Sequence, residues 1–381
     1  MHPHLFTPGP VEVPHSVRAA GAAPLVGHRS ETYFALLEEI AALLKKLLRA
    51  SQPVITLPSS GTGALEALAA NLLDPGDAVI SFSCGAFGDR FREIASRRGA
   101  TILPVDIPRG RTATPSDVRL ALEQHPGAAA VLFTHNETST GALTDLRACT
   151  SALPEDGPLV LVDAVSSLGA VPCFPEEQRI DGLASCSQKG LLTPPGIGIV
   201  ALSERGWKRA ASRPSPSYYF DLPLHRRFLE KSRPQNPYTP PVTLLYSLAE
   251  ALRFLDGIGF ERRFADVERT ARTFETACEA MGLSLFVKEQ ELRSPAVTAV
   301  TVPEGRAEEM KRALAELGVE VAEGQGKEPM LRVAHYSPGG WPELCLVAGS
   351  LYGAGRACGL ELSPDFLEPA WNCWKKGACT Q

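Results

Sequence analysis

Short apolar runs alternate with amphipathic segments along the first half of the chain. The runs are mainly apolar and lie at 54–57, 78–82, 101–105, 129–134, 158–162, 182–185 and 198–202. Strands that are apolar on both faces are typical of a parallel sheet covered by helices on each side. We therefore predict an α/β fold with a mostly parallel seven-stranded sheet flanked by helices.

The amphipathic segments predict the helices. Apolar residues recur at helical spacing at 33–48, 63–73, 87–98 and 242–255. After residue 257 the pattern changes to a helix at 263–281, strands at 296–302 and 331–334, and helices at 307–317 and 341–359. We expect an N-terminal arm at 1–20, a large domain at 21–256, a small α+β domain at 257–362 and a tail at 363–381.

Two segments show no hydrophobic period. Residues 213–241 are rich in proline, aromatic residues and arginine, which predicts a long irregular segment on the surface. Residues 363–381 predict a surface appendage, and the purpose of Cys373 and Cys379 within it stays open.

Composition narrows the class of protein. The 381 residues carry a net charge of −5, which argues against nucleic acid as a partner because phosphate backbones need a basic surface. No stretch approaches the ~20 apolar residues of a membrane span, and the N-terminus lacks the regions of a signal peptide. Nine scattered cysteines without a CxxC pair favour reduced thiols in the cytoplasm and indicate no metal site.

Polar and glycine-rich segments follow several of the predicted strands. Ligands of parallel sheets bind where the carboxyl ends of the strands meet. Lys189 follows one such strand, between small polar residues and a Gly/Pro turn. It is either a solvated loop charge or an amine held for covalent chemistry, and nearby Cys186 is best explained as a small buried filler.

Three further features lie at the same predicted edge. The turn at 59–63 leads from a strand into a helix, and it is either a phosphate cradle or an ordinary helix cap. Asp163 ends an apolar strand and either caps a turn or pairs with a cation. Phe87 lies between glycines, where its ring either packs in the core or stacks on a flat ligand.

Together these parts match the needs of pyridoxal 5′-phosphate (PLP): an anion cradle, an acid for the ring nitrogen, a stacking ring and a lysine. The chain resembles the fold-type I, class V PLP-dependent aminotransferases, most closely the alanine–glyoxylate and serine–glyoxylate group. The resemblance runs from residue 5 to about 360. Its motifs are Thr7-Pro-Gly-Pro10, Gly27-His-Arg-Ser30, Ser59-Ser-Gly-Thr-Gly-Ala-Leu-Glu66, His135-Asn-Glu-Thr-Ser-Thr-Gly141, Val162-Asp-Ala-Val-Ser-Ser167 and Ser187-Gln-Lys-Gly190.

The resemblance implies a role for each candidate around the cofactor ring. Lys189 would form the Schiff base with PLP and then shuttle the proton between Cα and C4′. Asp163 would keep the pyridine nitrogen protonated, and Phe87 would stack on the ring. Thr138 and Gln188 would hydrogen-bond the ring hydroxyl or the phosphate.

The resemblance also implies how phosphate and substrate are held. Phosphate would be bound by Ser60, Gly61 and Thr62, joined by Thr239 from the other subunit of a homodimer. Arg332 would take the substrate carboxylate as a bidentate pair. Gly9 and His28 belong to N-terminal segments that line the active site in the family, although a structural role for His28 is an equal alternative.

We therefore expect a cytoplasmic, homodimeric aminotransferase that moves an amino group from serine, alanine or aspartate to a 2-oxo acid such as glyoxylate or pyruvate, by a ping-pong mechanism. Cysteine desulfurases usually have histidine where this chain has Gln188 and Phe87, which disfavours a lyase. A non-catalytic relative, like the small subunits of soluble hydrogenases, is the alternative, and phosphonate-specific aminotransferases remain open. After Arg332 the chain departs from the family pattern, which leaves donor and acceptor open.

Overall fold

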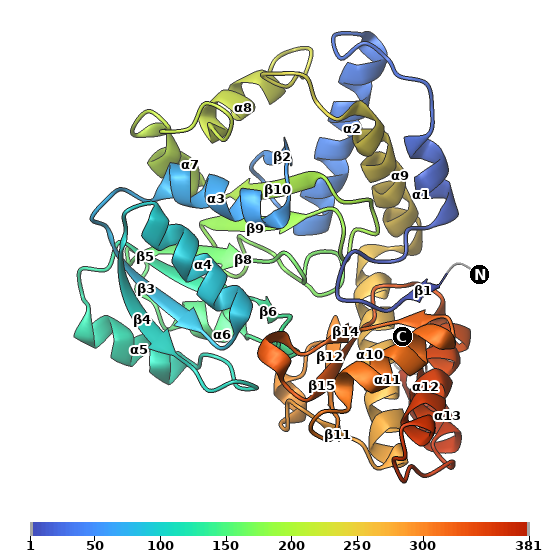
Figure 1. Cartoon of the computed structure of the whole chain (residues 1–381). Helices are drawn as coiled ribbons and strands as arrows, with labels where there is room; N and C mark the ends of the chain where they lie inside the picture. The colour runs from blue at the N-terminus through green and yellow to red at the C-terminus, as the bar shows by residue number, and fades with distance from the viewer. Residues whose placement is uncertain (1–2, 379–381) are drawn as a thin grey trace.

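The computed structural model describes residues 3–378 and contains one large and one small sheet, each covered by helices (Figure 1). The large sheet has seven strands, in the order β2 (Val54–Pro58), β10 (Ile197–Leu202), β9 (Gly182–Cys186), β8 (Leu159–Asp163), β5 (Ala130–Thr134), β3 (Ala78–Ser83) and β4 (Thr101–Asp106). Every neighbouring pair is parallel except that β10 is antiparallel to both β2 and β9. The predicted mostly parallel sheet is therefore present.

Alternate residues of the strands point to opposite faces of this sheet and contribute to two hydrophobic layers, one on each face. Ile55 and Leu57 pack under one set of helices, whereas Val54 packs under the other. The first set is α3 (Gly61–Leu72), α4 (Ala86–Arg97), α7 (Glu204–Ala211) and α8 (Leu222–Leu229). The second set is α2 (Glu31–Leu48), α5 (Pro115–Gln124), α6 (Leu146–Ser151) and α9 (Val242–Ile258).

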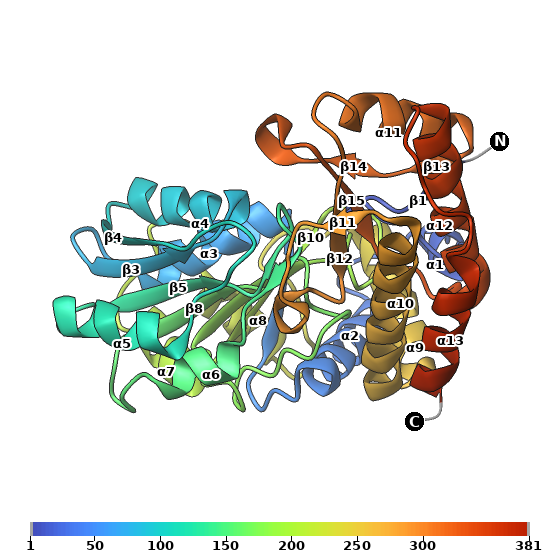
Figure 2. The same cartoon turned by 90° about the horizontal axis from the view of Figure 1, so that it is seen from below.

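The small sheet is antiparallel and has its own core. Its order is β11 (Ser284–Leu285), β12 (Val297–Thr301), β15 (Met330–Ala334) and β14 (Ala322–Glu323). The helices beside it are α10 (Phe260–Met281), α11 (Ala307–Glu316), α12 (Gly340–Ala357) and α13 (Leu367–Ala378), and η1 (Gln290–Leu292) and η2 (Gln325–Lys327) are single turns. Seen from below, these helices lie at the opposite end of the molecule from β4 and α5 (Figure 2).

The N-terminal segment joins the two parts of the fold. Strand β1 (His4–Leu5) pairs in parallel with β13 (Val319–Glu320), far along the chain. Helix α1 (His15–Gly21) packs on α9. The chain between them therefore has to cross from the small sheet to the large part of the molecule (Figure 1).

Two segments that were expected to be irregular contain helices. Within 213–241, α8 begins at the N-cap Asp221, whose Oδ1 accepts the Leu224 N–H at 2.8 Å. In the tail, α13 packs on α10, and Ala370 on it is fully buried. The tail is therefore a helix packed on α10 along one side, although most of its side chains are exposed, and Cys379 lies outside the described residues.

The boundaries given to the arm, the two domains and the tail stay a prediction. Within residues 3–378, no helix is both long enough and apolar enough to cross a membrane.

Candidate active site

The site forms where the carboxyl ends of β8 and β9 meet the N-terminal segment. Lys189 lies three residues beyond β9 and is largely buried, and its Nζ donates a hydrogen bond to the carbonyl of Pro8. Gly9 has φ +135°, and a Cβ there would lie 2.4 Å from Lys189 Nζ. The N-terminal segment can therefore approach the lysine this closely only because position 9 has no side chain.

The surroundings of Lys189 favour its neutral amine. Burial lowers its pKa most strongly, because an ammonium group loses its hydration there. The charge of Arg332 lowers this pKa further, whereas the carboxylate of Asp163 raises it. A neutral amine is the form that attacks a carbonyl carbon.

Asp163 ends β8 and is only 4% exposed. Its Oδ1 accepts the Val165 N–H at 2.9 Å, and no other described residue donates to its carboxylate. Burial raises its pKa to about 7, while the Val165 N–H and the charge of Lys189 lower it. A cation placed beside this carboxylate would favour its ionised form.

The turn at the start of α3 is open to solvent. Ser60 is the N-cap, and its Oγ accepts the Gly63 N–H at 3.3 Å. Ser60 and Thr62 are exposed, and the first turn carries no acidic residue. Gly61 is buried, and a Cβ there would lie 2.6 Å from Val165. The backbone donors and the helix dipole therefore favour an anion here.

The loop 135–141, which includes the short strand β6 (Asn136–Glu137), brings Thr138 to the turn that follows Asp163. Thr138 is 3% exposed, and its Oγ1 donates to Ser166 Oγ at 2.7 Å. Its carbonyl accepts Arg332 Nη1 at 3.0 Å. Gln188, beside the lysine, has a buried Oε1 that no described residue hydrogen-bonds.

Arg332 lies on β15 and is 8% exposed. Its Nε donates to the carbonyl of Glu323 at 2.9 Å, so both of its hydrogen bonds go to backbone oxygens. Burial lowers its pKa, and the charges of Glu137 and Glu328 oppose this. Among the described residues no carboxylate forms an ion pair with it, so its charge is available to a carboxylate ligand.

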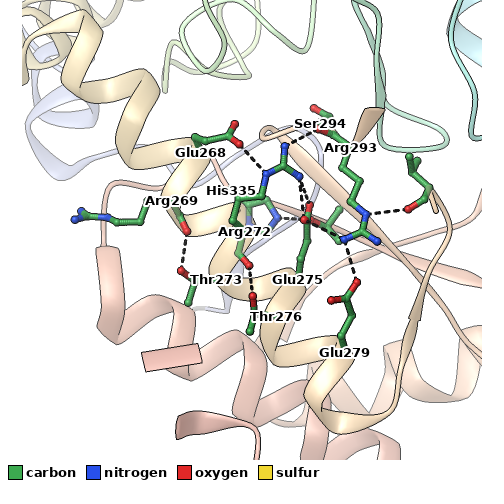
Figure 3. A network of polar contacts seen from close by, with 12 residues as sticks. Glu268, Arg269, Arg272, Thr273, Glu275, Thr276, Glu279, Arg293, Ser294 and His335 are labelled. Atoms are coloured by element: carbon green, nitrogen blue, oxygen red, sulfur yellow. Dashed lines mark hydrogen bonds and ion pairs between the residues drawn. The ribbon is translucent and has the colours of Figure 1, made fainter. Parts of the chain in front are cut away.

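A network of charges on α10 fixes the segment that meets the loop 135–141 (Figure 3). Arg272 donates to Glu268 and Glu275, and the buried Glu275 also faces Arg293 at 3.5 Å. Next to Arg293, the Ser294 N–H donates to the Gly141 carbonyl at 2.8 Å. The segment that follows η1 therefore holds the loop 135–141 in place through this hydrogen bond.

Phe87 lies in the first turn of α4, with the Arg90 guanidinium 4.9 Å from the centre of its ring. The ring is only partly buried, so it is not a core residue. Its N–H donates to Glu137, a fully buried carboxylate that the sequence reasoning missed.

Two candidates lie outside this cluster of contacts. Thr239 is exposed and forms no hydrogen bond with the described residues of its own chain. His28 is partly exposed and likewise unbonded, although Arg29 next to it donates to Gln235 Oε1 at 2.8 Å. The structure therefore gives neither residue a link to Lys189 within one chain.

The residues present fit PLP. Asp163 has a buried carboxylate that lacks a cationic hydrogen-bond partner, and Gln188 has an acceptor without a donor. The open turn at Ser60 offers hydroxyl and N–H donors to a phosphate. The ring nitrogen, a polar substituent of the ring and the phosphate of the cofactor could therefore each be bound by a group that lacks such a partner here.

The comparison with protein families decides the assignment. The family model for class V aminotransferases matches residues 17–339. The chain belongs to the class V aminotransferases. These enzymes depend on PLP, so the predicted fold class, enzyme class and cofactor are confirmed.

Named relatives of this class V aminotransferase differ in function. The chain is 34% identical to the L-aspartate–glyoxylate aminotransferase of Paracoccus denitrificans, over 79% of this chain and 77% of the relative. It is 35% identical to the soluble hydrogenase 42 kDa subunit of Anabaena cylindrica, over 87% of each. The crystal structure of pyridoxamine–pyruvate aminotransferase from Mesorhizobium loti superposes with a TM-score of 0.92 at 27% identity, covering 99% of this chain and 98% of that one.

Proposed function

We propose that this class V aminotransferase moves the amino group of a small amino acid, namely serine, alanine or aspartate, to a 2-oxo acid such as glyoxylate or pyruvate. The observation that carries the proposal is Arg332, a buried guanidinium held by two carbonyls and paired with no described carboxylate. Amino acids and 2-oxo acids share the carboxylate that such a group binds. One anchor therefore serves both half-reactions of a ping-pong cycle.

PLP, when bound, supplies the electron sink that makes the Cα proton of an amino acid acidic. Lys189 would carry that proton between the substrate Cα and the cofactor C4′, which requires a neutral amine between steps. The lowered pKa of Lys189 supports this role. Asp163 would hold a proton on the ring nitrogen, and its buried, singly bonded carboxylate supports that assignment.

Phe87 would limit the cofactor ring on one face, and Thr138 and Gln188 would bond its polar substituents. Ser60, Gly61 and Thr62 would bind the phosphate. The exposure of Ser60 and Thr62 supports completion by a second subunit, because the turn is open to solvent in a single chain. We place Thr239 of the partner subunit there, in a homodimer.

The substrate assignment is supported by relatives named for glyoxylate as acceptor, with aspartate, alanine or serine as donor, at 32–34% identity. The free thiols of the eight described cysteines are consistent with a reducing compartment such as the cytoplasm. Against a desulfurase, burial raises the pKa of Cys186 to about 12, which suppresses its thiolate.

An accessory, non-catalytic role is the second candidate, because two relatives at 34–35% identity are named as hydrogenase subunits. The test is a half-reaction screen. Purified protein is loaded with PLP, and single amino donors are added while the absorbance of the bound cofactor is followed. Bleaching by serine, alanine or aspartate supports the aminotransferase. A protein that takes up PLP but responds to none of a full set of amino donors favours the accessory role.

A further inference from the structure

The amino end of α4 is capped by a different segment of the chain. Its N-cap is Gly85, which has no side chain to offer. The Ala86 N–H donates instead to Ser139 Oγ at 3.1 Å. The N–H groups of Phe87 and Gly88 both donate to Glu137 Oε2, at 3.1 and 3.0 Å. The donors that a helix leaves free in its first turn are thus taken up by the loop 135–141.

Glu137 is fully buried, yet among the described residues no arginine, lysine or histidine forms an ion pair with it. Its charge is stabilised by backbone donors and by the helix dipole. Besides the two bonds from α4, its Oε1 accepts the N–H of Ser139 at 3.0 Å and the hydroxyl of the same residue at 2.5 Å. A Cβ at Gly85 would lie 2.6 Å from the Glu137 carboxyl carbon, so the glycine makes room for the carboxylate.

The same loop reaches two other parts of the site. The residue after Glu137 is Thr138, whose carbonyl accepts Arg332 Nη1 and whose hydroxyl donates to Ser166 Oγ. Ser166 belongs to the turn that follows Asp163. A shift of Glu137 would therefore move the Phe87 backbone, the Arg332 anchor and the turn after Asp163 together.

We propose that Glu137 is a positioning residue that sets the Phe87 ring against the cofactor ring and, through Thr138, holds Arg332 in place for the substrate carboxylate. The proposal rests on the function proposed above. Glu137 touches neither cofactor nor substrate in this assignment, because all the hydrogen bonds of its carboxylate come from Ser139 and from the backbone of α4.

The test is Glu137→Gln. The amide keeps the shape of the side chain but turns one acceptor into a donor that faces backbone N–H groups. We expect the Kd for PLP to rise about tenfold, as the loss of one charged hydrogen bond implies. The KM for the amino donor should rise as well, and the visible circular dichroism of bound PLP should fall because the ring is held less firmly.

Glu93→Gln is the matched control, since Glu93 is an exposed carboxylate on α4 whose one ion pair among the described residues is with Arg97. Gly85→Ala is a second variant, which displaces Glu137 while keeping its charge, and it should reproduce the effects of Glu137→Gln. Thermal unfolding of the apo forms tests whether each variant is folded. The comparison with wild type then uses the variant or variants that fold.

Three results are decisive. A folded variant of Glu137 or Gly85 with wild-type PLP affinity, circular dichroism and KM would overturn the positioning role alone. Wild-type protein that binds no PLP would overturn the proposed function as well. Weaker PLP binding and a raised KM in Glu137→Gln, with Glu93→Gln unchanged, would support the assignment.

Discussion

Helices α3 and α4 begin in the same way, but only α4 has an anionic group of the chain at its amino end. Each follows a strand of the large sheet after two residues, Ser59 and Ser60 for α3 and Cys84 and Gly85 for α4. Each presents free N–H groups at the same edge of the sheet. The α4 end is filled by the buried carboxylate of Glu137, whereas the α3 end is exposed and has no acid in its first turn.

This difference distinguishes the α4 end, where a carboxylate of the chain itself is bound, from the α3 end, where a ligand can bind. A helix amino end attracts negative charge wherever it lies, so the dipole alone does not mark a binding site. What distinguishes the two ends is whether another segment of the chain already supplies the anion. The comparison predicts that changes at α4 reduce stability and cofactor geometry, while changes at α3 reduce phosphate affinity.

The largest effect is expected at the lysine between the two ends. Lys189→Ala should lower kcat by more than about 10³-fold, because no other described amine lies in this position. Phosphate binding at α3 should survive, so the variant should still retain PLP without a covalent bond. Turnover and cofactor retention after gel filtration are the measurements. Full activity in this variant would remove the assigned role of Lys189.

Asp163 should make the apoprotein less stable as pH rises. Its pKa is raised from 3.8 to about 7 in the folded state, so between these values the native state binds more protons than the unfolded state. Stability attributable to Asp163 is therefore full below about pH 4 and lost as pH passes 7, by about 4 kcal/mol in order of magnitude.

Urea unfolding of wild type and Asp163→Asn at pH 4 to 8 measures this slope. The free energy of unfolding of Asp163→Asn should rise relative to that of the wild type as the pH approaches 8. Parallel curves for the two proteins would mean that Asp163 ionises normally. The carboxylate of Glu137 accepts hydrogen bonds from four donors, whereas that of Asp163 accepts one. The experiment tests whether this difference leaves Asp163 protonated at neutral pH.

Removing the internal anion should cost stability. Glu137→Ala leaves the N–H groups of Phe87 and Gly88 buried without acceptors, which we expect to lower the free energy of unfolding by about 3 kcal/mol. Glu93→Ala, on the exposed face of the same helix, should change it by less than about 0.5 kcal/mol. Equal effects of the two changes, measured by urea unfolding, would break the distinction between the two helix ends.

The open end should contribute less to stability than the end filled by Glu137. Ser60→Ala removes the N-cap of α3 and should lower the free energy of unfolding by about 1 kcal/mol. The same change should also weaken PLP binding, with the Kd for PLP rising about tenfold. Thermal stabilisation by inorganic phosphate should weaken in this variant. Unaltered PLP and phosphate binding would move the anion site away from α3.

The sequence predicted what is local and missed what depends on distant partners. Lys189, Asp163 and the turn at Ser60 each follow an apolar strand, so their place at one edge follows from the parallel pattern. Glu137 was missed because its partners, Phe87 and Gly88, lie 50 and 49 positions away, and nothing beside it signals a cap. A glycine at the N-cap, with no Ser, Thr, Asp or Asn in its place, was the available hint.

The helices that were missed have two different explanations, one local and one distant. In α5, the capping box of Thr114 and Asp117 was a readable signal that hydrophobic period alone did not reveal. The apolar pattern of α13 is too short to predict a helix by itself, and the helix is stabilised by packing on α10. The placement of Gly9 against Lys189 required the pairing of β1 with β13, which no local pattern encodes.

That pairing has a consequence for how the protein is made. His4 and Leu5 are synthesised 315 positions before their partners Val319 and Glu320. The pairing that positions the Pro8 carbonyl against Lys189 therefore cannot form until β13 has been synthesised. Truncated nascent chains can form much of the large sheet, yet they have no means of assembling a finished active site.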